Sequence, residues 1–203
     1  MFKLVGLILL AAVQLGEFCV AAANPDPLAP GSNFSAALTN LENAAAAFAR
    51  TDYGGEFPPD IPRLEGIFAL VKQCSDSYDA AGIQLAAFAP SLSGGFLSES
   101  DAATLNATVP STLGVILGHL DILQAGKAFF EGVNNNRLLL TMYCHWIGNL
   151  FRETDFFLGL LILGAPSPDY ASSWTQLQTN AGFQYNILLT ANGDGFSCGG
   201  SDP

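Results

Sequence analysis

Apolar residues recur at intervals of three and four along most of this 203-residue chain. In the first such series, Phe34, Leu38 and Leu41 are followed by Ala45 and Phe48. This spacing places the side chains on one face of an α-helix, which has 3.6 residues per turn. The chain shows no sustained alternation of apolar and polar residues between hairpin turns, as half-buried β-strands would require. The sequence therefore predicts an all-α fold.

Four further segments have the same periodicity and are separated by stretches that contain proline and glycine. They are predicted to form helices over residues 64–88, 98–123, 137–163 and 170–189. Ser98 and Asp101 have the spacing of a capping box, and Pro110 is expected to kink the helix that follows. In the last segment, either Phe183 or Tyr185 faces the core. Because short connections join long helices, we predict an antiparallel bundle of about five helices with short loops.

The first residues have the layout of a secretory signal peptide. A basic start at Lys3 precedes an apolar run over residues 4–15, and Ala21 and Ala23 match an A-x-A cleavage site. We therefore predict a signal peptide over residues 1–23 and a secreted protein. The rest of the chain is predicted to hold three parts, namely a proline-rich linker over 24–32, a helical bundle domain over 33–190 and a flexible C-terminal tail over 191–203.

The charge balance excludes several classes of partner. Lys and Arg total 7 whereas Asp and Glu total 18, so the net charge is −11. Proteins that bind nucleic acid need a basic face, and so do proteins that dock electrostatically on anionic lipid. This acidic chain is therefore not expected to bind nucleic acid or to dock electrostatically on anionic lipid.

The strong apolar run over residues 156–163 is too short to cross a bilayer, so no transmembrane span is expected.

Three cysteines follow the predicted signal peptide: Cys74, Cys144 and Cys198. In an oxidising compartment the simplest interpretation is one disulfide and one free thiol, and the sequence leaves the pairing open. Cys74 and Cys144 both fall in helical segments, so each could instead be a small buried apolar residue. The fold is not expected to depend on a disulfide framework.

Residues that carry catalysis are sparse and scattered. The two histidines are His119 and His145, and although Cys144 precedes His145, adjacent residues of a helix do not face each other. The sequence lacks a phosphate-binding loop, a dinucleotide-binding motif, a nucleophile elbow and metal-ligand spacing. We therefore predict a protein that is not an enzyme, with no catalytic residue, no metal site and no cofactor.

Two sequons are present in the chain, at Asn33 and Asn106. In a secreted protein both are candidate N-glycosylation sites. The alternative is that the two sequons occur by chance.

Apolar residues are more abundant than one shared helix seam requires. Over residues 151–163 they cover nearly the whole helix circumference, whereas a surface helix needs only one apolar stripe. One explanation is a central helix buried on all sides. The other is a cavity or exposed patch that binds a lipid or a hydrophobic surface. The candidate lipid-binding residues lie on the inward stripes: Phe68, Val71, Leu113, Leu117, Leu150, Phe157 and Leu161.

Several stretches resemble the fungal hydrophobic-surface-binding and cell-wall (galacto)mannoprotein family. They are the Tyr-Gly-Gly turn at 53–55, the opening of the third helix at 97–102, the series over 109–129 and the long helix over 138–163. The resemblance implies a secreted all-helical domain, often associated with the cell wall. Some members hold fatty acids between helices, and others adsorb to hydrophobic solids. The resemblance carries over no individual ligand-binding residue.

These observations favour a secreted, non-enzymatic protein that binds a fatty acid, another apolar ligand or a hydrophobic surface at the cell wall. Cell-wall polysaccharide is a further candidate partner. The alternative is a glycosylated structural protein of the cell wall without a small-molecule ligand.

Overall fold

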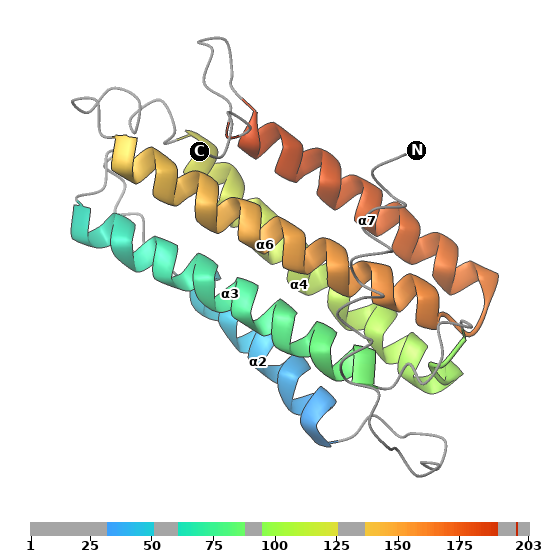
Figure 1. Cartoon of the computed structure of the whole chain (residues 1–203). Coiled ribbons are helices and arrows are strands. Elements are labelled where there is room, and N and C mark those ends of the chain that lie inside the picture. Colours follow the sequence, from blue (N-terminus) through green and yellow to red (C-terminus); the bar gives the residue numbers. More distant parts are fainter. Residues whose placement is uncertain (1–31, 51–60, 88–94, 126–136, 191–197, 199–203) are drawn as a thin grey trace.

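A computed structural model of the chain describes residues 32–50, 61–87, 95–125, 137–190 and 198. These residues form five α-helices and contain no strand: α2 (Ser32–Ala49), α3 (Ile61–Ala87), α4 (Glu99–Ala125), α6 (Arg137–Gly164) and α7 (Pro168–Leu189). The helices pack lengthwise against one another (Figure 1). The predicted all-α bundle of about five helices is confirmed. Outside the described residues lie the predicted signal peptide, almost all of the linker, the turn at 53–55 and all of the tail except Cys198.

Each helix runs opposite to the one before it in the chain, so the bundle alternates in direction (Figure 1). Sequence order and spatial order nevertheless differ. The helices form a closed ring in the order α2, α3, α6, α7, α4 and back to α2, and the backbone of each comes close only to those of its two ring neighbours. As a result α3 and α6 lie side by side and parallel, whereas the backbones of the consecutive helices α3 and α4 do not come close to each other.

The centre of the ring is filled by large side chains. The bulkiest fully buried residues are Trp174, Tyr78, Tyr143, Tyr185, Phe34, Phe48, Phe68 and Phe157. Burial of each such side chain contributes on the order of 1.5–3 kcal/mol, so this aromatic centre is a major source of stability. Of the two alternatives that the sequence leaves open in α7, Tyr185 faces the core, while 66% of Phe183 is exposed.

Two local motifs fix the end of the bundle where α4 begins. The Ser98 Oγ accepts a hydrogen bond from the Asp101 amide at 3.1 Å, and the Ser98 hydroxyl donates to the Asp101 carboxylate at 2.6 Å. The predicted helix start at Ser98 is therefore confirmed. The residues just before it cap α6, because the amides of Gly95 and Leu97 donate to the last carbonyls of α6, each at 2.9 Å. Gly95 has a φ of +71°, which glycine adopts without strain.

The opposite end of the bundle carries a disulfide between Cys144 and Cys198. This bond ties the chain beyond α7 to the first half of α6 across a separation of 54 residues. In the chain-entropy description, closing such a loop stabilises the fold by about 4 kcal/mol. Cys74 is free and buried, and burial raises the pKa of its thiol to about 12. Of the alternatives that the sequence leaves open, Cys144 is therefore a disulfide partner and Cys74 a small buried core residue.

Replacement of two glycines of the bundle by alanine should have opposite effects on stability. A Cβ at Gly164 would lie 2.6 Å from the Phe96 ring, whereas a Cβ at Gly114 would meet no atom within 4 Å. Gly164→Ala should therefore lower the free energy of unfolding by about 1–3 kcal/mol through overpacking. Gly114→Ala should raise it by about 0.5–1 kcal/mol, because alanine restricts the unfolded chain and favours helix. Chemical denaturation measures both, and equal effects of one sign would contradict the packing described.

Candidate functional site

A groove of about 300 Å³ runs between α4 and α7. These two helices are parallel ring neighbours. The groove is lined by Pro110, Leu113, Gly114, Leu117 and Gly118 from α4 and by Leu177, Asn180, Ala181 and Gln184 from α7. Its volume is at the lower end of the range seen for small-molecule sites, so it suits a slender ligand.

The groove exists because α4 lacks side chains where it faces α7. Gly114 and Gly118 are four residues apart and therefore lie on the same side of the helix. A Cβ built on either glycine would meet no atom within 4 Å, so open space remains above both. At the start of the two helices the gap is bridged instead, because the Ser173 hydroxyl donates to the Asn106 Oδ1 at 3.0 Å.

The floor of the groove is apolar, and its rim carries two amide side chains. Leu113 and Leu117 are buried, and Leu177 is half-buried between the helices. Asn180 and Gln184 are exposed, and each amide carries both hydrogen-bond donors and acceptors. None of the nine described residues that line the groove is charged. The groove can therefore hold an apolar chain and offer hydrogen bonds to a polar end.

The structure brings two of the seven sequence-predicted lipid-binding residues, Leu113 and Leu117, together in this groove. The other five lie elsewhere in the buried core, on α3 and α6: Phe68, Val71, Leu150, Phe157 and Leu161. Sequence reasoning missed Asn180 and Gln184, and no motif distinguishes them from other surface amides. The Gly-x-x-x-Gly spacing at 114 and 118 is a signal that could have indicated the open helix face.

Three side chains with hydroxyl groups, Thr154, Tyr185 and Tyr78, are buried inside the bundle. The Thr154 hydroxyl donates to the Leu150 carbonyl at 2.7 Å, so in its 3.3 Å contact with Tyr185 the tyrosine hydroxyl is the donor. The buried Tyr78 hydroxyl has no hydrogen-bond partner among the described residues. Burial, with Tyr185 and Cys74 nearby, raises the pKa of Tyr78 well above its ordinary value. These groups stay neutral, and an enclosed phenol without access to solvent is not a catalytic acid or base.

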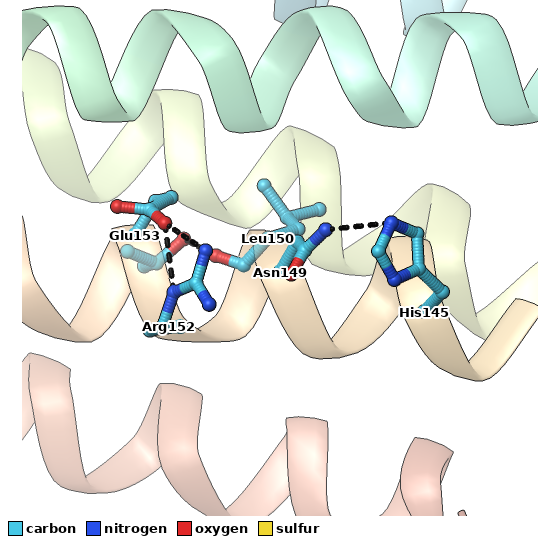
Figure 2. Close-up of polar contacts among 6 residues, drawn as sticks. His145, Asn149, Leu150, Arg152 and Glu153 are labelled. Atoms are coloured by element: carbon cyan, nitrogen blue, oxygen red, sulfur yellow. Dashed lines mark hydrogen bonds and ion pairs between the residues drawn. The ribbon is translucent and has the colours of Figure 1, made fainter.

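Both histidines contact polar groups of nearby helix residues. Figure 2 shows the Nδ2 of Asn149 lying 3.1 Å from the Nε2 of His145 on an exposed part of α6, one turn from the Arg152–Glu153 ion pair. Because Cys144 is in a disulfide, it offers no thiolate to His145. His119 lies between α4 and the end of α2, with its ring nitrogens 2.9 Å from the Val115 carbonyl and 3.1 Å from the Ala49 carbonyl.

Of the two predicted glycosylation sites, Asn106 is half-buried on α4 and accepts the hydrogen bond from Ser173. The side chain of Asn33 lies outside the described residues. In the part of the chain that the structure describes, no three His, Cys, Asp or Glu side chains are placed to bind a metal ion. No helix within the same described ranges is both long and apolar enough to cross a membrane.

Comparisons with protein-family models, with curated proteins and with solved structures found no match for this chain. The groove geometry and the residue chemistry therefore carry the functional argument.

Two buried tyrosines offer a matched test of the interior. The Tyr143 hydroxyl donates to the Leu188 carbonyl at 3.2 Å, whereas the Tyr78 hydroxyl donates to nothing. Tyr143→Phe should lower the free energy of unfolding by about 1 kcal/mol, because a hydrogen bond is lost. Tyr78→Phe should raise it by about 1 kcal/mol, because an unsatisfied buried hydroxyl is removed. Equal destabilisation of both variants in urea titrations would show that the Tyr78 hydroxyl is satisfied in solution.

Proposed function

We propose that this protein binds a single apolar chain, such as that of a lipid, in the groove between α4 and α7. The observation that carries the proposal is an open, leucine-based groove of about 300 Å³ on a bundle whose other large apolar side chains are mostly buried. An apolar chain that lies in this concave site removes part of its own surface from water, which is a source of binding free energy. The function is binding rather than catalysis.

The size of the groove sets the expected ligand. A water-sized group occupies about 30 Å³, and a methylene is of similar size, so the groove accommodates about ten carbons. At about 0.8 kcal/mol per methylene the gross gain is on the order of 8 kcal/mol. Loss of translational and rotational freedom opposes this gain by at least about 4 kcal/mol. At most about 4 kcal/mol remains, so the expected dissociation constant for a ten-carbon chain is about millimolar or weaker.

Adsorption to a hydrophobic surface has less support from the structure. The exposed large apolar residues among those described are Ile83, Val115, Leu163 and Phe183, and they belong to four different helices. Adsorption to a solid needs a contiguous apolar patch. The groove therefore suits a soluble ligand better than these separate side chains suit a surface.

Secretion is part of the proposal. The Cys144–Cys198 disulfide is of the kind that persists in oxidising compartments, which agrees with the signal-peptide layout at residues 1–23. Association with a fungal cell wall, membership of the mannoprotein family and glycosylation at Asn33 and Asn106 rest on the sequence pattern. In this setting the protein would collect or present apolar molecules outside the cell.

Filling the groove tests the proposal directly. Gly114→Leu places a side chain in open space above the groove floor, whereas Gly148→Leu places the same side chain in open space on α6. Both variants gain helix propensity, so they are matched in stability. With 1-decanol in isothermal titration calorimetry, Gly114→Leu should weaken binding about tenfold or more, because about two methylenes' worth of contact or greater is lost. Gly148→Leu should bind as the wild type does.

Two outcomes would contradict the groove as the binding site. Equal affinity of all three proteins would place the ligand elsewhere. Absence of decanol binding by the wild type would favour the alternative of a glycosylated structural wall protein without a ligand.

A further inference from the structure

None of the described residues that line the groove is a cation that could meet an acidic head group. Its nine described lining residues are leucine, glycine, proline, alanine and two amides. Lys72 lies on α3 in an ion pair with Asp76, and Arg152 lies on α6 in an ion pair with Glu153. Neither helix contributes to the groove.

The charge of the whole chain adds to this effect. The net charge is −11, so the protein as a whole repels anions. A carboxylate at the rim would lose part of its hydration without meeting an opposite charge among the described lining residues. By contrast, a hydroxyl, ester or amide would lose little, since the Asn180 and Gln184 amides at the rim can both donate to it and accept from it.

We propose that the groove selects single-chain amphiphiles with an uncharged polar head, such as a medium-chain alcohol or a monoacylglycerol, against fatty-acid anions of the same length. This inference rests on the proposed function and narrows its ligand class. The polar head lies at the Asn180–Gln184 rim, and the chain lies over Leu113, Leu117 and Leu177.

The chain offers a matched pair of charge variants with which to test this selection. Gln184 lines the groove, whereas Gln73 is exposed on α3, which contributes no described residue to the groove lining. Gln184→Lys and Gln73→Lys change the net charge of the protein equally. Only Gln184→Lys places a cation beside the ligand.

Binding of 1-decanol and of decanoate at pH 7 is measured by calorimetry for the wild type and both variants. The wild type should bind decanol about tenfold or more tighter than decanoate, the effect of an uncompensated charge at a partly buried site. Gln184→Lys should strengthen decanoate binding about fivefold without strengthening decanol binding, because the nearby cation supplies a charge-assisted contact to the carboxylate. Gln73→Lys should leave both affinities near those of the wild type.

Equal wild-type affinity for decanol and decanoate would overturn the selectivity while leaving the groove as a lipid site. An equal gain in decanoate binding for both lysine variants would also overturn it, because net charge rather than the groove lining would then control the head group. Absence of decanol binding by the wild type would instead refute the proposed function itself.

Discussion

The five helices close into a ring whose centre is filled by large side chains, because the backbones of helices that are not ring neighbours do not come close to each other. Packed helices lie about 8–10 Å apart, so a ring of five leaves a wider interior than a four-helix bundle does. Aromatic residues from α2, α3, α6 and α7 occupy that interior. Some of them carry polar atoms into it, and the Tyr78 hydroxyl and the Trp174 indole nitrogen have no partner there. Filling the centre therefore takes precedence over satisfying every polar group.

On the outside of the ring, the space between α4 and α7 is not filled by side chains. Where α4 faces α7, glycine replaces larger residues at positions 114 and 118, and the helices leave a groove instead of closing tightly. Gly-x-x-x-Gly pairs often let two helices approach closely, but here Leu177 and Leu117 occupy the seam and the glycines stay open to solvent. The same feature that weakens packing supplies the concave apolar surface from which we propose a function.

Periodicity alone predicts the five helices, because burial of one face at 3.6 residues per turn is a local property. The helix start at Ser98 is likewise local, since its cap reaches only to Asp101. Which helices become neighbours is not local. Placing α4 next to α7 rather than α3 depends on how all the faces fit together, and so does the choice of Tyr185 over Phe183.

The candidate site was predictable only in part, for the same reason. Leu113 and Leu117 belong to an inward stripe that the sequence shows, but whether that stripe borders a groove depends on the partner helix. Asn180 and Gln184 line the groove only because of the register of α7 against α4, which the sequence does not show. The pairing of Cys144 with Cys198 was open in the sequence, because it depends on how the chain returns after α7.

Methyl-resolved NMR titration with 1-decanol would locate the ligand most directly. The account predicts chemical-shift changes and ligand contacts at the methyl groups of Leu113, Leu117, Leu177 and Ala181, which line the groove on α4 and α7. Leu150 and Leu161, inside the core of α6, should not respond. Ligand contacts confined to the α6 methyl groups, with the groove leucines unchanged, would contradict it.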